Sequence, residues 1–287
     1  PSDGLTPLLP LVLDDPMSGI YRTAIDFGAT NPRQVSTPRP LRHGTTNRTK
    51  VLGDRSVTMT LELFDADTSD VTVRDWLDRL APWCDPERRS FLYFTDPAGA
   101  HDPARRGERR IRLVADKMSA PREHPTSAMV AASWIGYRGV LEDAAETTAT
   151  VVPADDAPGW SPPLVPPLTF PGPLPAIGTT VHQIGTTAAE ITARIHGPIT
   201  GPVLTNVTTG ELVSFPGLVL RAGEWLDLDF ASPSALQDGT ANRYGRLDFA
   251  LSTWWRLPMG QSVITLTGES ITPDARADLA WRSPYLL

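Results

Sequence analysis

The sequence of 287 residues has a single cysteine, Cys84, and no apolar run that approaches the roughly 18 residues of a membrane-spanning helix. One cysteine excludes an internal disulfide and any zinc site built from several cysteines. The first residues, PSDGLTPLLPLVLDDP, lack the cationic region that opens a signal peptide. Folding must therefore rest on apolar burial and backbone pairing, and we expect no contact with a membrane.

Motifs of catalysis and of metal or cofactor binding are also missing. The five histidines have no HxH or HExxH spacing, and there is no GxSxG elbow, phosphate-binding loop or dinucleotide fingerprint. The segment FDADTSD (64–70) begins like a calcium loop, but Asp70 stands where that loop needs glycine and Trp76 where it needs glutamate. We interpret it as an acidic loop that precedes a helix. The sequence predicts no enzyme, no metal and no cofactor.

Two further activities are disfavoured by charge and by strand parity. The net charge of −7 argues against a general nucleic-acid binder, which needs clustered cations. Glu224, Asp227 and Asp229 could be a glycosidase acid pair. However, alternation places Asp227 and Asp229 on one solvent-facing side without an apolar pocket to raise a pKa.

The chain is instead rich in proline and glycine, with 29 and 22 residues, which is typical of many turns and short strands. Proline is densest in VVPADDAPGWSPPLVPPLTFPGPLP (151–175). Because proline lacks the amide hydrogen that a ladder needs, this segment predicts an extended spacer rather than a central strand or a helix. We therefore expect an N-terminal domain (1–150), a proline-rich linker (151–175) and a C-terminal domain (176–287).

The N-terminal domain is predicted to be a β structure with one α-helix across it. Residues 55–64 alternate with period two, as a half-buried strand does. A helix is predicted near 70–81, capped by Ser69 or Asp70 and ended by Pro82. Its apolar stripe consists of Val73, Trp76, Leu77 and Leu80. Further strands are expected at 89–96, 109–119 and 126–143.

The C-terminal domain is predicted to be a sandwich of two antiparallel sheets. Alternating stretches separated by turn residues indicate its strands, at 188–197, 201–215, 217–230, 246–255 and 261–269. In the third of these, Leu226, Leu228 and Phe230 share the inward face, which leaves Trp225 outward.

Two tryptophans and four arginines are candidate contact residues. Neighbouring strand residues point to opposite faces, so if Leu247, Phe249 and Leu251 fill the core, Trp255 is buried and Trp254 faces outward. Exposed aromatic rings are typical of partner or ligand contacts, which makes Trp225 and Trp254 candidates. The stretch PARRGERRIR (103–112) predicts a basic loop that contacts a subunit, grips phosphate or is simply solvated. Its candidate residues are Arg105, Arg106, Arg109 and Arg110.

The second half of the sequence also resembles a known family. It contains ARIHGPITGPVLTNVTTGELVSFPGLVLRAGEWLDLDF, then ALQDGTANRYG, then STWWRLPMGQSVITLTGE. A Gly-Pro after a strand, an Asn before a Thr-Gly turn, a Gly-Glu before an alternating strand and a Trp-x-x-Leu-x-x-Gly pattern resemble the distal tail proteins of long-tailed bacteriophages. One departure is Gln261-Ser262, where an Asn is expected after the glycine.

The resemblance covers most of the chain and implies a β-rich, ring-forming N-terminal domain with one helix, joined by a linker to a galectin-like β-sandwich. It implies a non-enzymatic virion part at the tail tip, made in the host bacterial cytoplasm. Such a part forms a ring, with six copies expected, that connects the tail tube protein to the tail-tip hub protein and the receptor-binding proteins. DNA would pass through the lumen without specific binding.

Two other functions remain open on the residues alone. A carbohydrate-binding module contacting host cell-wall polysaccharide is favoured by Trp225 and Trp254, although a galectin-type set of polar residues is not evident in the strands. A wall-degrading enzyme is disfavoured, because no acid pair, metal ligands or nucleophile are found.

Overall fold

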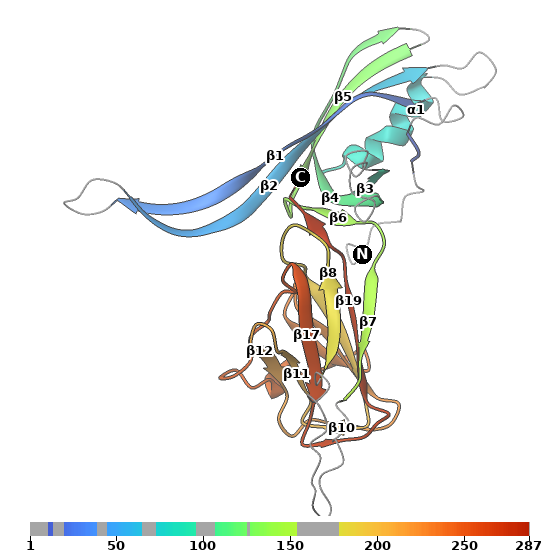
Figure 1. The fold of residues 1–287 in the computed structure, drawn as a ribbon. Coiled ribbons are helices and arrows are strands. Elements are labelled where there is room, and N and C mark those ends of the chain that lie inside the picture. The colour runs from blue at the N-terminus through green and yellow to red at the C-terminus, as the bar shows by residue number, and fades with distance from the viewer. Residues whose placement is uncertain are drawn as a thin grey trace, which may run out of the picture. The chain divides into compact units, whose positions relative to one another are not determined.

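The computed structural model describes residues 11–13, 20–38, 45–64, 73–95, 107–124, 127–153 and 178–286 (Figure 1). The chain divides into two compact units, residues 1–142 with 286–287 and residues 143–285. The described residues form antiparallel strands and one α-helix, so the predicted mainly β fold is confirmed.

The first unit is built on an antiparallel sheet with the order β1-β2-β5-β4-β6, and β3 pairs with β4 as well. Its two longest strands form a hairpin that extends well beyond the rest of the sheet (Figure 1). The elements are β1 (Ile20–Pro38), β2 (Thr45–Phe64), α1 (Val73–Leu80), the 3-10 turn η1 (Ala81–Cys84), β3 (Arg89–Thr95), β4 (Glu108–His124), β5 (Ser127–Gly136) and β6 (Leu141–Asp143).

Alternation explains most of this sheet. In β2, the apolar residues Val57, Met59, Leu61 and Leu63 are all buried, as the strand predicted at 55–64 requires. The single strand predicted over 126–143 is wrong, because the chain turns between β5 and β6. Gly139 has φ +67 in that turn, and a Cβ there would lie 2.0 Å from the Gly53 carbonyl oxygen, so the turn requires glycine.

Helix α1 confirms the predicted apolar stripe. Val73, Trp76, Leu77 and Leu80 are its buried residues. The helix passes into η1, which has a proline at its start, so Pro82 tightens the chain into a 3-10 turn rather than ending it at once. The expected caps, Ser69 and Asp70, lie outside the described residues.

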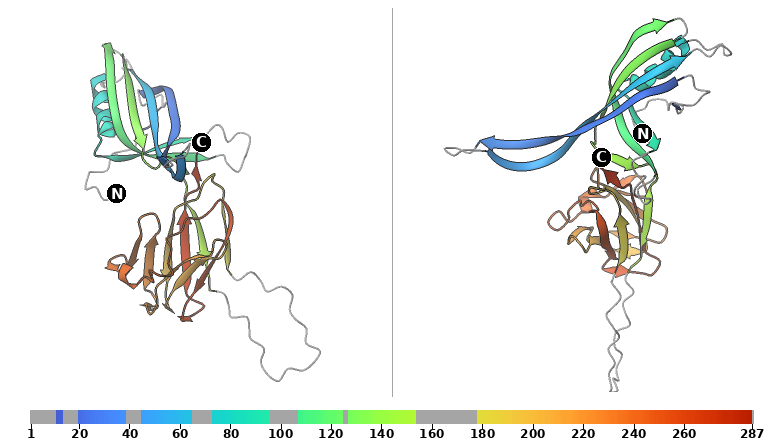
Figure 2. Two further views of the ribbon diagram at one scale, coloured as in Figure 1. Left: turned by 90° about the vertical axis from the view of Figure 1, so that its left-hand side faces the viewer. Right: turned by 45° about the horizontal axis from the view of Figure 1, so that its top comes forward.

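The second unit is a β-sandwich. Its larger sheet has the order β16-β15-β14-β9-β19-β7, the opposite sheet β12-β11-β17-β8, and a small third sheet β13-β10-β18 (Figure 2). The strands are β7 (Thr147–Val151), β8 (Thr179–Gln183), β9 (Ile191–His196), β10 (Ile199–Thr200), β11 (Val203–Asn206), β12 (Glu211–Ser214), β13 (Val219–Leu220), β14 (Trp225–Asp229), β15 (Ser234–Gln237), β16 (Ala241–Asn242), β17 (Gly260–Thr267), β18 (Ser270–Ile271), β19 (Arg276–Trp281) and β20 (Pro284–Tyr285), with the 3-10 turn η4 (Tyr244–Arg246).

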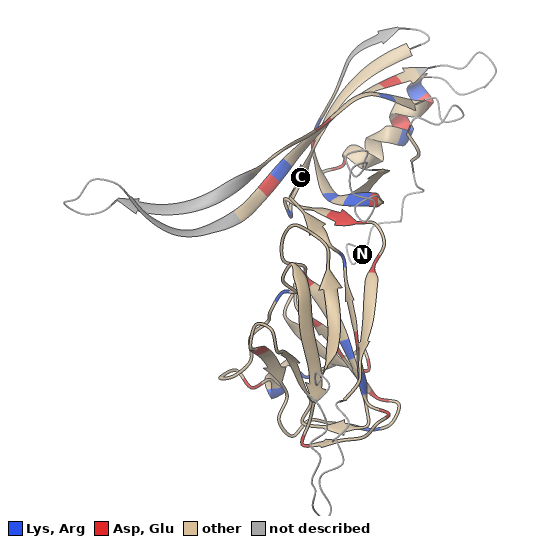
Figure 3. Cartoon of the chain, viewed as in Figure 1, with Lys and Arg blue, Asp and Glu red and all other residues tan. Residues whose placement is uncertain are grey.

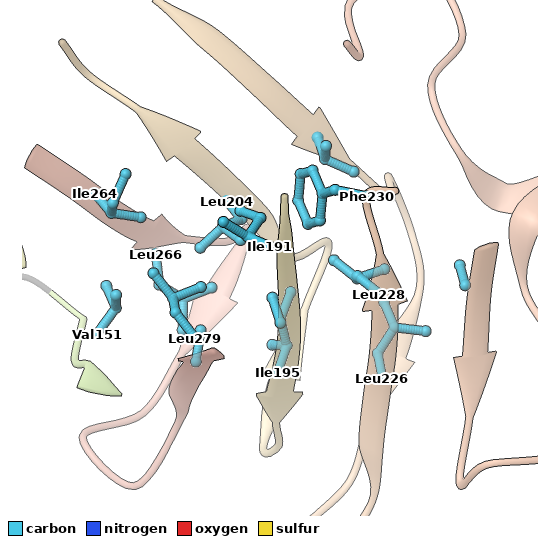
Figure 4. Close-up of a cluster of buried hydrophobic side chains, with 14 of the residues drawn as sticks. Val151, Ile191, Ile195, Leu204, Leu226, Leu228, Phe230, Ile264, Leu266 and Leu279 are labelled. Atoms are coloured by element: carbon cyan, nitrogen blue, oxygen red, sulfur yellow. The ribbon is translucent and has the colours of Figure 1, made fainter. Parts of the chain in front are cut away.

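One continuous core lies between the two larger sheets (Figure 4). Ile195 and Leu226 come from the larger sheet, and Leu204 and Ile264 from the opposite one, all fully buried. Burying such a side chain stabilises a fold by about 1.5–3 kcal/mol. The core confirms the sandwich of antiparallel sheets predicted for the C-terminal half.

Three of the strands predicted in this half differ in detail. Residues 201–215 form the hairpin β11–β12, in which Asn206 Oδ1 accepts the N–H groups of Thr208 and Thr209 at 3.1 and 3.3 Å. Residues 217–230 are divided into β13 and β14 by a turn at Gly223, which has φ +85. Each division falls at a turn signal that the sequence contains, Thr209-Gly210 and Ala222-Gly223.

The strand predicted over 246–255 is wrong. Asp248 Oδ1 accepts the N–H groups of Ala250 and Leu251, at 3.0 and 3.3 Å, and so curls the chain into a turn. Phe249 and Leu251, expected in the core, are 63% and 65% exposed. Local hydrogen bonding by an aspartate therefore overrides the alternating pattern.

The division between the units falls before strand β7. This strand pairs with β19 in the larger sheet of the second unit, and its Val151 is fully buried in that core. The sequence analysis assigned residues up to 150 to the N-terminal domain. Most of the predicted linker (151–175) lies outside the described residues.

Candidate functional site

The outward face of the larger sheet of the sandwich carries the densest polar cluster of the second unit. Strands β14, β9 and β19 place their residues in two transverse rows on this face. One row is Trp225, His196 and Arg276, and the other is Asp227, Arg194 and Asp278. The residues between them along each strand are buried, so the rows follow from strand alternation.

Arg194 is held by a bidentate ion pair. Its Nε lies 2.6 Å from Asp227 Oδ1 and its terminal nitrogen 3.2 Å from Oδ2. The indole N–H of Trp225 donates to the same Oδ2 at 3.0 Å, and the guanidinium lies 5.3 Å from the Trp225 ring centroid. The hydrogen bond to Asp227 raises the pKa of Arg194 above its usual value.

Asp278 is the centre of a second group. Its carboxylate accepts a hydrogen bond from Thr150 Oγ1 at 2.7 Å, lies 3.0 Å from His196 Nε2 and is 3.4 Å from Arg276 Nε. Burial raises the pKa of Asp278, but the hydrogen bond from Thr150 and the charges of Arg276 and His196 outweigh it. The pKa of this carboxyl therefore lies below its usual value.

Arg194, His196, Asp227 and Asp278 are among the residues that line a shallow hollow of about 760 Å³ on the sheet. The Trp225 ring lies beside it, in contact with Arg194 and Asp227. Such a surface suits a polar, uncharged ligand, since charges of both signs already pair with one another. The pKa of Asp278 is lowered, whereas a general acid needs a raised one. Among the described residues, no group of three or more His, Cys, Asp or Glu side chains could hold a metal ion.

The two candidate tryptophans have different surroundings. Trp225 lies on the outward face, as predicted. Trp254 was expected to face outward from a strand, but it packs half-buried against the core. Its ring meets Phe230 edge-on at 5.2 Å and stacks on Tyr244 at 6.0 Å, while Trp255 is 1% exposed. The loop that replaces the predicted strand allows both rings to turn toward the core.

The predicted basic loop is also placed differently. Arg105 and Arg106 lie outside the described residues, whereas Arg109 and Arg110 belong to strand β4 and are 3% and 9% exposed. Arg110 donates through Nε and a terminal nitrogen to Glu142 Oε2, at 3.1 and 2.9 Å. The expectation of an exposed loop is wrong for these two residues, because strand β4 already begins at Glu108 and both side chains are buried in it.

An exposed aromatic patch on β3 was missed by the sequence analysis. Phe91 and Tyr93 are 42% and 54% exposed, with ring centroids 6.3 Å apart. The guanidinium of Arg110 lies 4.8 Å from the Phe91 centroid and that of Arg112 5.9 Å. The alternation of RSFLYFT contains the signal, because it places Phe91 and Tyr93 on the same face of the strand.

The fold of this two-unit β protein is similar to that of a solved phage hub protein, in line with the resemblance of its sequence. It is similar to the SPP1 Dit (gp 19.1) protein, described as "a Paradigm of Hub Adsorption Apparatus in Gram-positive Infecting Phages". The TM-score is 0.62 at 11% sequence identity, over 94% of this chain and 95% of that one.

A chain of the phage P2 baseplate in its activated conformation with Ca has a TM-score of 0.44 at 8% identity, over 92% of this chain and 90% of that one. No protein-family model and no curated protein matches the sequence. The described part of the chain has no helix long and apolar enough to cross a membrane.

Proposed function

We propose that the chain is a structural, non-enzymatic subunit of a bacteriophage tail tip. In this proposal six copies form a ring that joins the tail tube protein to the tail-tip hub protein and the receptor-binding proteins. The observation that carries the proposal is the likeness of fold, over almost the whole of both chains, to a hub protein of a phage adsorption apparatus. The virion tail tip would be its location, after synthesis in the host bacterial cytoplasm.

Features of the first unit support self-association. Exposed aromatic residues beside arginines, as at Phe91, Tyr93 and Arg112, are enriched in protein interfaces. We assign ring formation to the N-terminal domain and treat the C-terminal sandwich as a galectin-like unit behind the linker. The first unit has equal numbers of acidic and basic residues, and a neutral ring lining would let DNA pass without gripping it.

Negative-stain electron microscopy of the purified full-length chain tests this function. The expected result is class averages of rings with a central opening and six-fold symmetry. A Phe91→Ser/Tyr93→Ser variant should form fewer rings while keeping its circular dichroism spectrum. Particles that remain single copies at tens of micromolar, by microscopy and by sedimentation, would contradict the proposal.

A second candidate function is carbohydrate binding by the sandwich. The hollow on the larger sheet favours it, because Thr192, His196 and Arg194 there offer hydrogen-bonding groups for hydroxyls, and Trp225, in contact with Arg194, offers a ring for stacking beside them. Titration with host cell-wall polysaccharide should then show binding that Trp225→Ala abolishes. Phe249→Ala, which removes an exposed ring elsewhere, is the control and should leave it unchanged. Equal loss in both variants, or no binding by the wild type, rejects this function.

A further inference from the structure

One end of the sandwich core carries buried polar side chains. Gln183 of β8, Asn206 of β11 and Ser262 of β17 are each 0% exposed, although the core beside them is apolar. Gln183 pairs with the residue two positions before Ser262 in β17, and Asn206 pairs with the residue two positions after it. Strand alternation keeps all three on the inward face of the sheet. Gln183 and Asn206 are therefore diagonal neighbours of Ser262, one on each side.

Each of these side chains has an atom without a hydrogen-bond partner among the described residues. Gln183 donates through Nε2 to the Thr187 carbonyl, but its Oε1 accepts no hydrogen bond. Asn206 accepts the turn N–H groups through Oδ1, but its Nδ2 donates to no group, and Ser262 Oγ has no partner. Rotation of either amide group would leave the other atom unpaired, so it does not remove the deficit.

Two buried tryptophans bring further donors to the same end of the sandwich. Trp281 ends strand β19 and Trp255 precedes β17, and the indole Nε1 of each lacks a partner in the described part of the chain. Thr186 donates its N–H to the Pro284 carbonyl at 2.9 Å, so the chain that leaves β8 meets the chain that leaves β19. The segment of Trp255 pairs with the chain just before β9, whose first residue is the partner of Trp281. We call this set the polar end of the core: Gln183, Asn206, Ser262, Trp255 and Trp281.

The unpaired atoms of the polar end differ in kind. Asn206 Nδ2 and the two indole N–H groups are donors, Gln183 Oε1 is an acceptor, and the Ser262 hydroxyl can be either. An occupant must therefore donate and accept hydrogen bonds at once. Strands β8, β11 and β17 contain no Lys, Arg, Asp or Glu (Figure 3). An ion is thus an unsuitable occupant, because a buried charge needs a charged partner.

We propose that the polar end of the core binds ordered water. Water both donates and accepts, and a buried water molecule typically makes about three hydrogen bonds to polar groups that otherwise lack partners. A buried donor or acceptor that stays unpaired costs stability, so five such side chains at one end favour a bound partner. The inference is independent of the proposed ring and of glycan binding. It assigns to the sandwich a bound component that links the segment of Trp255 to strands β8 and β17.

The sign of one stability change tests the proposal. Ser262→Ala removes a hydroxyl that has no partner among the residues that the structure describes. If this hydroxyl binds water, its loss breaks hydrogen bonds, and the equilibrium constant for unfolding should rise by about fivefold. In a dry site the same change removes an unpaired buried group, and the variant should be as stable as the wild type or more stable. Urea unfolding of the full-length chain measures the difference.

Ser270→Ala is the matched control, because Ser270 is an exposed serine in strand β18 of the same unit. It should change the equilibrium constant for unfolding by less than about twofold. Circular dichroism verifies that both variants are folded.

A crystal structure of the full-length chain that resolves ordered water gives the direct test. Water should lie at hydrogen-bonding distance, roughly 3 Å, from Ser262 Oγ and from another unpaired atom of the polar end. A map that shows water on the protein surface but none at the polar end would overturn the proposal. A Ser262→Ala variant at least as stable as the wild type would also overturn it. Both results would leave the ring-forming function standing, because no residue of the first unit is involved.

Discussion

The two units of this chain differ in the side chains that their sheets expose to solvent. In the second unit, the polar residues of the larger sheet pair with one another, and Arg194, Asp227 and Asp278 all have partners on the same face. The first unit also contains local ion pairs, such as Arg110 with Glu142, but it exposes the aromatic rings of Phe91 and Tyr93 on strand β3.

The two units also differ in net charge. Residues 143–285 contain seven arginines and fourteen acidic residues, and therefore carry the whole net charge of −7. The first unit, residues 1–142 with 286–287, has equal numbers of acidic and basic residues.

The largest loss of stability is expected in the core of the second unit. Trp255→Ala removes a fully buried ring that lies 4.9 Å from Phe230, and should lower the free energy of unfolding by about 3–5 kcal/mol. Urea unfolding of the full chain measures it. Trp254→Ala, at a half-buried neighbour, should cost less, and equal losses would contradict the assigned burial.

A largely buried ion pair of the first unit, Arg110 with Glu142, sharpens the comparison between the two units. Glu142→Ala leaves the guanidinium of Arg110, whose side chain is 11% exposed, without its carboxylate, and should cost about 3 kcal/mol. The double variant Arg110→Met/Glu142→Met should recover most of this loss, because the other partner of Glu142, Arg112, is more exposed, at 25%. If it is as unstable as Glu142→Ala, the buried pair is not what the single change disrupts.

A smaller loss is expected at the β11–β12 turn. Asn206 is fully buried, and its side chain accepts two backbone N–H groups, so Asn206→Ala should cost about 1–2 kcal/mol. Asn242→Ala is the control, since the exposed Asn242 accepts a single N–H, from Tyr244 at 2.8 Å. A cost at Asn242 that matches that at Asn206 would show that burial does not set the effect.

The smallest effect concerns pH. The pKa of Asp278 is lower in the folded state than in the unfolded state, so its contribution to stability is present above the unfolded pKa. That contribution is lost as pH falls through the folded pKa. Asp278→Asn should remove it, a difference below about 1 kcal/mol for this partly exposed group. Thermal unfolding of both proteins from neutral to acidic pH measures it, and a gap that widens on acidification would reverse the sign.

Much of the fold follows from periodicity in the sequence, and its failures have local causes. Strand β2 and helix α1 are predicted because their apolar residues recur with periods of two and 3.6, which packing then uses directly. The strand expected at 246–255 fails because the side chain of Asp248 bonds to nearby backbone groups, a competition that alternation does not register.

The candidate sites are less predictable, because they depend on residues far apart in the chain. The outward position of Trp225 follows from strand parity, but its neighbours Arg194 and Asp278 come from other strands through the register of the sheet. The pairing of Arg110 with Glu142 likewise joins residues 32 positions apart. No local pattern indicates which acid meets which base.

The central claim is that copies of this chain assemble into a closed ring through their first units. Native mass spectrometry of the full-length chain tests this claim most directly. The chain mass is 31.1 kDa, so a closed ring of six copies predicts a species of about 187 kDa at low salt. The Phe91→Ser/Tyr93→Ser variant should give mainly the mass of one copy. A wild type found as a single copy at every salt concentration would contradict the account.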